Sequence, residues 1–289
     1  MESRTLDALV VLRSPLSHGE IPTQFARRSN VLEARTAKII GQDGAVYTLP
    51  CISGNSLRGQ MRDLAAERTC EELDLSQKSL PPSVFHLLFS GGGLKKRADG
   101  EESKLIPNIR ARIRELWPFV SLFGGTVRGQ FVSSRLSVGF AQPLTKQTPP
   151  GHYGCSMEDA GALPDAADLA KAISELRYAR RDDAGKYCLA AAEEDDKTAA
   201  LYGIQSVPAG TRFAWRLRAD GTAVEHSCLR GALEAFCARG RVGGKVAIGY
   251  GDAEITMTTT GLPDVSVYST FLRENRDAIV ASIEELLSE

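Results

Sequence analysis

The segment Ile52-Ser53-Gly54-Asn55-Ser56-Leu57-Arg58-Gly59-Gln60-Met61-Arg62 contributes most to deciding the fold of this 289-residue chain. Asn55 and Ser56 favour helix N-caps, and the apolar residues behind them repeat at helical spacing. Arg58 and Arg62 are four residues apart and therefore share one helix face. The segment predicts a tight turn that opens a helix, whose free N–H groups and arginines suit a phosphate. A plain capped helix explains the same residues.

A second glycine-containing motif lies near the other end of the chain. It reads Gly243-Gly244-Lys245-Val246-Ala247-Ile248-Gly249-Tyr250-Gly251. Without side chains at the glycines, nothing obstructs the approach of a ligand backbone such as that of RNA. Either motif alone is weak support for a nucleic-acid site, because glycine turns are common.

The rest of the chain alternates short strands and helices. We expect an α+β fold with an antiparallel sheet, because long parallel-sheet patterns are missing. The predicted strands cover residues 6–12, 45–50, 130–141, 253–257 and two segments on either side of Pro208-Ala209-Gly210, and the predicted helices cover 165–177, 229–238 and 270–287.

Composition narrows the functional classes. The net charge is −1, but residues 95–135 hold nine basic and four acidic side chains, which permits one basic face or an ordinary solvated surface. The chain has no run of 18 apolar residues, which argues against a membrane span. The six cysteines form no C-x-x-C pair and there are four histidines. We therefore expect free thiols in a reducing cytoplasm, with neither a metal site nor a cofactor.

The order of these motifs resembles a known family. A strand near the N-terminus is followed by the 52–62 motif, a basic insertion, Val207-Pro-Ala-Gly-Thr-Arg-Phe213 and the final glycine-rich loop. This order is similar to the RAMP superfamily of CRISPR-associated proteins, and in particular to its guide-RNA-binding backbone subunits. The segment Pro118-Phe-Val-Ser-Leu-Phe-Gly-Gly125 resembles the type IV variant.

The resemblance implies a single RAMP-type domain over residues 1–289. Its palm would be RRM-like (ferredoxin-like), with a finger-like insertion at about 81–115 and a thumb hairpin at about 178–205. Copies of such a subunit stack along the guide in an effector ribonucleoprotein for antiviral defence, beside other subunits. The target DNA or RNA strand then pairs with the guide, a division of labour known from other guided effectors.

The resemblance also implies where the guide RNA would lie. Most contacts should be to phosphates and so carry no sequence information. The expected RNA-binding residues are Arg27, Arg28, Ser53, Gly54, Asn55, Ser56, Arg58, Arg62, Arg180, Arg181, Gly243, Gly244 and Lys245. Tyr47, Phe131, Phe140 and Tyr250 are candidates to stack on bases, but the RRM signature is missing, and we expect most of them in the core.

We expect no catalysis, although two enzymatic alternatives stay open. Type III backbone subunits cleave target RNA with an aspartate in the loop before the helix, and here the loop at residues 25–33 holds no aspartate. Glu33 and then Asp43 would be the residues to test if cleavage occurred. A guide-processing ribonuclease of the superfamily would rely on histidine, and only His18 is placed to serve, although it reads more simply as an ordinary loop residue.

Overall fold

The computed structural model describes residues 1–19, 31–92, 108–127, 129–149, 162–180 and 200–283. Arg27, Arg28 and Arg181 lie outside the described residues. The strands are β1 (Glu2–Leu12), β2 (Val31–Leu32), β3 (Thr36–Ile40), β4 (Val46–Pro50), β5 (Gly125–Val127), β6 (Gln130–Val132), β7 (Leu136–Val138), β8 (Gln142–Pro143), β9 (Ser174–Arg180), β10 (Ala200–Ser206), β11 (Arg212–Gly221) and β12 (Ala253–Met257).

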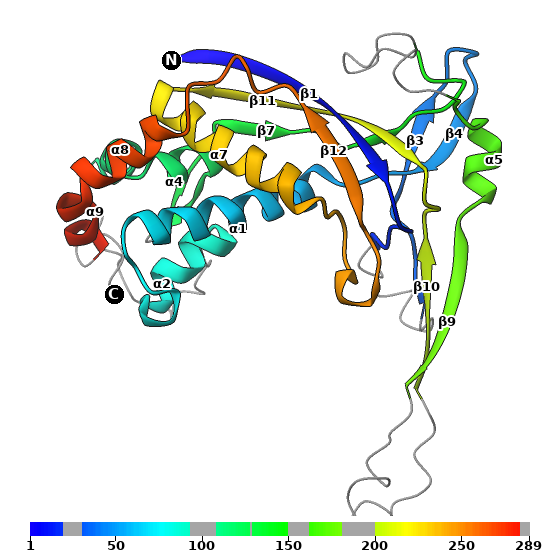
Figure 1. The fold of residues 1–289 in the computed structure, drawn as a ribbon, viewed down its shortest axis with the longest axis horizontal. Helices are drawn as coiled ribbons and strands as arrows, with labels where there is room; N and C mark the ends of the chain where they lie inside the picture. The colour runs from blue at the N-terminus through cyan, green and yellow to red at the C-terminus, as the bar shows by residue number, and fades with distance from the viewer. Residues whose placement is uncertain (20–30, 93–107, 128, 150–161, 181–199, 284–289) are drawn as a thin grey trace, which may run out of the picture.

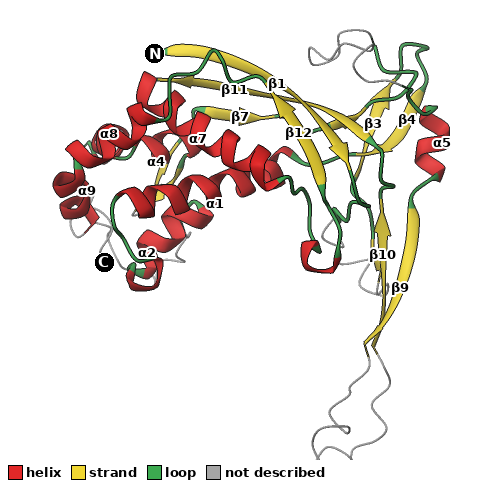
Figure 2. Ribbon diagram, viewed as in Figure 1, coloured by secondary structure: helices red, strands yellow, loops and turns green. Residues whose placement is uncertain are grey.

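Helices form the second layer (Figure 2). They are α1 (Gly54–Glu72), α2 (Pro82–Phe85), α3 (Ile109–Leu116), α4 (Pro118–Phe123), α5 (Ala166–Lys171), α7 (Ala223–Arg239), α8 (Ser266–Glu274) and α9 (Arg276–Ser282), with single turns η2 (Gln77–Ser79), η3 (His86–Ser90) and η6 (Val246–Ile248). No helix among the described residues is both long and apolar enough to cross a membrane.

The central sheet confirms the predicted fold class. Its strands run in the order β12-β1-β11-β7, all pairs are antiparallel, and β8 adds to β11. Along the chain the central elements are β1, α1, β7, β11, α7 and β12, which is the β-α-β-β-α-β order of a ferredoxin-like domain. The palm is therefore an RRM-like α+β unit.

One face of this sheet is covered by α1 and α7 (Figure 1). Alternate residues of β1, such as Leu6 and Val10, are buried, while Asp7 and Leu9 between them are only partly buried. This alternation follows from the two-residue period of a strand. The buried side chains meet helix residues spaced by three and four, among them Leu57 and Met61 of α1.

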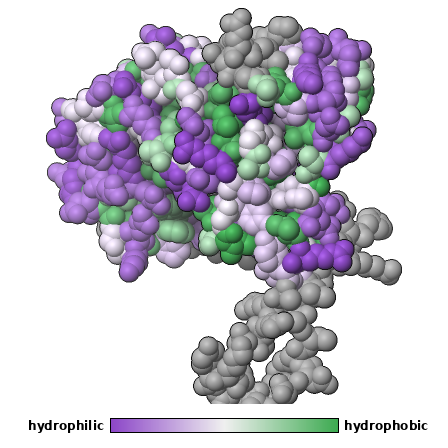
Figure 3. All heavy atoms as spheres, turned by 45° about the vertical axis from the view of Figure 1, so that its right-hand side comes forward, coloured by the Kyte–Doolittle hydropathy of each residue, from purple (hydrophilic) through white to green (hydrophobic). Residues whose placement is uncertain are grey.

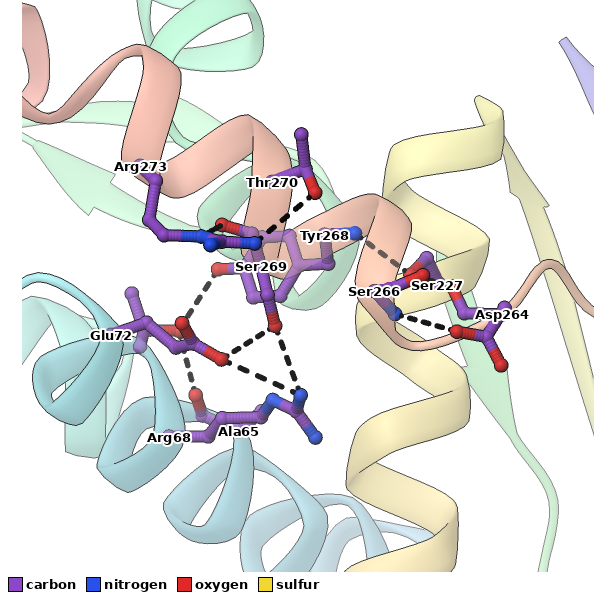
Figure 4. Close-up of polar contacts among 11 residues, drawn as sticks. Ala65, Arg68, Glu72, Ser227, Asp264, Ser266, Tyr268, Ser269, Thr270 and Arg273 are labelled. Atoms are coloured by element: carbon purple, nitrogen blue, oxygen red, sulfur yellow. Dashed lines mark hydrogen bonds and ion pairs between the residues drawn. The ribbon is translucent and has the colours of Figure 1, made fainter.

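The C-terminal helices pack on the palm, and they form two short helices where the sequence predicts one over residues 270–287. Ser269 joins α8 to α1, because its hydroxyl donates to Glu72 at 2.5 Å and accepts from Arg68 at 3.0 Å (Figure 4). Ser227 of α7 donates to the Asp264 carbonyl at 2.6 Å and accepts from the Tyr268 amide at 2.9 Å. The last helices thus close the helical layer.

Two other sequence predictions were wrong in detail. The predicted helix over 165–177 ends at Lys171, and Ser174 already begins β9. The strand predicted over 130–141 is broken into β6 and β7. The described part of the predicted finger, which comprises α2, η3 and α3, packs into the core through side chains such as Val84, Leu88 and Ile113.

The β9–β10 hairpin extends away from the palm (Figure 1). Its arms pair antiparallel from Ser174 opposite Ser206 out to Arg180 opposite Ala200. Short parallel pairing between β10 and β2 completes a three-stranded sheet. These arms occupy the region in which the sequence predicts a thumb, although β9 begins four residues before the predicted boundary.

Candidate nucleic-acid interface

Helix α1 begins two or three residues earlier than the sequence predicts. Ser53 is the N-cap, and its hydroxyl accepts a hydrogen bond from the Ser56 amide at 3.3 Å. Asn55 is the second helical residue and is exposed. Gly54 is buried, and a Cβ there would lie 2.1 Å from the Val138 carbonyl oxygen of β7. This glycine is therefore required by the protein's own packing.

Arg62, which the sequence analysis expected to contact RNA, is instead buried inside the protein. Its guanidinium is buried and donates to four backbone carbonyls, those of Leu87, Leu88, Phe123 and Gly124, at 2.6–3.4 Å. It also lies 5.7 and 5.6 Å from the ring centres of Phe119 and Phe123. Burial, followed by the charge of Arg58, lowers the pKa of Arg62 to about 10. The Arg62 side chain therefore anchors neighbouring segments of the protein and does not face a ligand in solvent.

Arg58 points to the same place but is only half-buried, so its contact with RNA stays a prediction. Its guanidinium donates to the Phe123 carbonyl, and burial lowers its pKa. Phe123 is the last residue of α4, where carbonyls lack partners within the helix and carry partial negative charge. Arg58 and Arg62 supply those partners, so the helix face that sequence spacing assigned to a phosphate faces α4 instead.

The glycine-rich loop is open in contrast. Lys245 is exposed and has φ of 59°, a left-handed conformation. The Gly244 amide donates to the Ser17 carbonyl at 2.8 Å, and Gly244 is itself exposed. Gly243 has φ of 73°, and a Cβ there would meet the Ser17 carbonyl oxygen at 2.7 Å. The loop therefore lies flat against the segment after β1 and leaves Gly244 and Lys245 facing outward.

Residues 15–18 join the two motifs. The Pro15 and Ser17 carbonyls accept from the Gly251 and Gly244 amides, at 2.9 and 2.8 Å. On the other side, the His18 Nε2 accepts from the Ser53 amide at 3.0 Å. The two glycine motifs are therefore neighbours in the fold, since one four-residue segment contacts both.

His18 makes a contact that sequence reasoning missed, since it was considered only as a candidate catalytic residue or an ordinary loop histidine. Burial, together with the charge of Arg35, lowers its pKa to about 4, which keeps the ring neutral and Nε2 available as an acceptor. Ser17-His18-Gly19 reads as a simple loop in the sequence, and no local signal indicates a partner 35 residues away.

The hairpin brings further candidates near this interface. The Tyr178 and Tyr250 hydroxyls are 2.7 Å apart, so β9 meets the glycine-rich loop. Arg180 is the last residue of β9 and pairs with Ala200 through the backbone. Hydrophilic residues dominate the helical end of the molecule, and hydrophobic ones reach the surface nearer the hairpin (Figure 3).

The four aromatic residues considered for stacking on bases differ in their exposure. Tyr250 is 4% exposed, as predicted for a core residue, whereas Phe131 and Phe140 are 62% and 47% exposed. The expectation that most of the four lie in the core was wrong for these two phenylalanines. Tyr47 is half-buried, and its hydroxyl donates to Asp43 at 2.6 Å.

The carboxylates considered for catalysis are separated from one another. Glu33 is exposed just after β2, and Asp43 lies in the turn between β3 and β4, where the Tyr47 hydroxyl and the Ala45 amide lower its pKa. Among the described residues no three His, Cys, Asp or Glu side chains come together as a metal site.

These observations define the class of protein by its architecture. It has an RRM-like palm, from which a hairpin projects beside an open glycine-rich loop. No protein-family model and no curated protein matches the sequence. A solved structure described as a Type IV-B CRISPR Complex contains a similar chain, with a TM-score of 0.57 and 24% sequence identity. The match covers 91% of this chain and 96% of that one. The two chains therefore share a fold over nearly their whole length.

Proposed function

We propose that this protein is a non-catalytic backbone subunit of a cytoplasmic CRISPR effector complex, where copies of it bind guide RNA side by side. Its partners would be the guide RNA, further copies of itself, other effector subunits and a target strand paired to the guide. The observation that carries the proposal is the meeting of both glycine motifs at residues 15–18, beside the projecting hairpin. The fold shared with a chain of a Type IV-B CRISPR Complex supports it.

The exposed groups of the interface suit an RNA backbone. Lys245 offers one positive charge, and Gly244 allows close approach because it has no side chain. Asn55 and Ser56 add polar groups at the start of α1. Such contacts position a nucleic acid without reading its bases, which is what a subunit serving any guide requires. Arg27, Arg28, Arg180 and Arg181 remain proposed contacts.

The surroundings of the candidate catalytic groups support a binding role. Cleavage of RNA by general acid–base catalysis needs a group free to take a proton from the 2′-hydroxyl. His18 Nε2 already accepts the Ser53 amide, and Asp43 already accepts from Tyr47. His18 would have to give up this bond before it could act as a base, and the hydrogen bonds to Asp43 lower its pKa, which makes that carboxylate a weaker base.

Purification with and without nuclease treatment tests the proposal. We expect a large particle that contains RNA of uniform length, and we expect nuclease to remove the RNA and dissociate the particle. The assembled complex, incubated with end-labelled complementary RNA or DNA and a divalent metal, should leave the target intact. A monomer free of RNA, with no affinity for added single-stranded RNA, would contradict the binding role. Regular cuts in the target would contradict the absence of catalysis.

A further inference from the structure

Three tyrosines meet where the β9–β10 hairpin passes the glycine-rich loop. Tyr178 and Tyr202 lie directly opposite each other on the two arms, and their rings stack with centres 5.4 Å apart and planes 18° from parallel. The Tyr178 hydroxyl is hydrogen-bonded to the Tyr250 hydroxyl at 2.7 Å. The stacked pair on the hairpin is therefore tied to one residue of the loop.

Tyr250 is a fixed point on the body of the protein. Its side chain is 4% exposed, and its amide donates to the Lys245 carbonyl at 3.4 Å. The next residue, Gly251, has φ of 77° and packs so closely that a Cβ would lie 2.0 Å from the Val242 carbonyl oxygen. Burial and the bond to Tyr178 raise the pKa of Tyr250 to about 12, so the phenol keeps its proton at neutral pH.

The hairpin is also held nearer its root and along β10, where Gly203 and Ile204 pair with β2. Ser174 and Ser206 share a hydroxyl hydrogen bond of 3.2 Å, and the Gln205 side chain accepts from the Ala34 amide at 3.1 Å. The Tyr178 bond lies further out than these contacts, at a position from which both arms continue away from the palm (Figure 1). A bond at that distance from the root resists rotation of the arms better than one at the root.

We propose that Tyr250 is a positioning residue, whose hydroxyl holds the stacked Tyr178–Tyr202 pair and so sets the direction in which the hairpin leaves the glycine-rich loop. The consequence for RNA rests on the proposed function. A hairpin held at one angle beside the loop meets a bound RNA at one place in every copy, which gives regular spacing along the guide.

The first test uses the protein without RNA. Tyr250→Phe and Tyr178→Phe each remove the same hydrogen bond from opposite sides and keep both rings. Since one hydrogen bond changes a local opening equilibrium by roughly 3- to 10-fold, hydrogen exchange of amides 176–178 and 202–204 should accelerate by about that factor in each variant. The double variant should be no faster than either single variant, because the bond is already lost.

Tyr47→Phe is the matched control, because it removes a hydroxyl bond of 2.6 Å to Asp43 on the separate β3–β4 hairpin. Its hairpin 174–206 should exchange at the wild-type rate. Unchanged exchange in both Tyr250→Phe and Tyr178→Phe overturns the positioning role, and so does additive acceleration in the double variant. Should Tyr250→Phe fail to fold, Tyr178→Phe decides, since its side chain is only half-buried.

The second test adds a long single-stranded RNA and maps its protection from nuclease. Wild type should protect RNA at regular intervals. Tyr250→Phe should bind RNA with an affinity within about threefold of wild type, but the boundaries of its protected intervals should vary in position. Failure of wild type to bind RNA contradicts the proposed function and leaves the exchange result to decide the positioning role. Sharp intervals in Tyr250→Phe, with wild type equally sharp, overturn the positioning role while the proposed function stands.

Discussion

The two glycine motifs have similar sequences, but the basic side chains of the first point into the protein and that of the second points to solvent. At the start of α1, Gly54 makes room for the β7 backbone, and Arg58 and Arg62 reach inward to α4. In the loop near the C-terminus, Gly244 and Lys245 face outward. A glycine near a basic residue thus permits close approach of another backbone, and only the surroundings show whether that backbone belongs to the protein itself or is left to an external ligand.

The largest expected difference between the motifs is the effect of removing their basic side chains on stability. Arg62→Ala removes four hydrogen bonds to backbone carbonyls, although the Phe123 carbonyl keeps Arg58 as a donor, and we expect a loss of about 3–5 kcal/mol in the free energy of unfolding. Chemical denaturation measures this loss. Arg62→Lys should retain only part of the stability, because an ammonium cannot reproduce the planar guanidinium geometry.

The matched control is Arg177→Ala on β9, whose side chain is 81% exposed. It should change stability by less than about 0.5 kcal/mol. An Arg62→Ala protein as stable as this control would show that Arg62 does not anchor α4, and the contrast between the motifs would fail.

The second-largest expected difference is the stability cost of replacing the glycine of each motif with alanine. Gly54→Ala places a Cβ 2.1 Å from the Val138 carbonyl oxygen, and we expect it to cost about 2–3 kcal/mol. Gly244→Ala places a Cβ 3.8 Å from the Ser17 carbonyl oxygen, an ordinary contact, so its cost should be below about 0.5 kcal/mol. Thermal unfolding of both variants compares the two glycines directly. Equal costs would mean that the two glycines serve the same structural purpose.

The bridge between the motifs should depend on pH. The pKa of His18 is about 4 in the folded protein and 6.5 in its ordinary range. Between these values the unfolded chain binds a proton that the folded protein does not. Stability present above pH 6.5 is therefore lost as the pH falls toward 4. We expect a loss of about 2 kcal/mol, below the full value of the shift because the ring is partly exposed to solvent.

His18→Gln checks this prediction, since its amide oxygen can accept the Ser53 amide but does not titrate. Denaturant unfolding between pH 7 and 4 should show a shallower fall in stability for this variant than for wild type. His86→Gln, a substitution at an exposed histidine, is the matched control and should keep the wild-type slope. Identical slopes in wild type and His18→Gln would show that His18 does not link the motifs as a neutral acceptor.

The smallest effect concerns the outward-facing motif. Lys245→Ala should leave stability unchanged and weaken RNA binding by a few-fold, nearly equally for unrelated sequences. In a salt titration the slope of log affinity should fall by about one ion's worth. Lys38→Ala, an exposed lysine on β3, should leave the slope unchanged. The same slope in Lys245→Ala and wild type would place the RNA elsewhere.

The sequence alone determined the order of elements and the fold class. Strands such as 253–257 were predicted with their observed bounds, because apolar residues alternate there and turn residues flank them. The helix after Ser53 was also predicted, although its start was placed two or three residues too late, since Ser53, Asn55 and Ser56 are all acceptable caps. Local patterns decide local structure, and these patterns lie within a few neighbouring residues.

Only the tertiary structure decided which way the side chains of the site face. Arg62 meets carbonyls up to 62 residues away, the His18 ring meets the amide of Ser53, and Tyr178 meets Tyr250 across 72 residues. Helical spacing places Arg58 and Arg62 on one face but does not say what covers that face. Partners so distant in the chain come together only when the palm folds, so the same basic residues can serve as an anchor in one motif and as an exposed contact in the other.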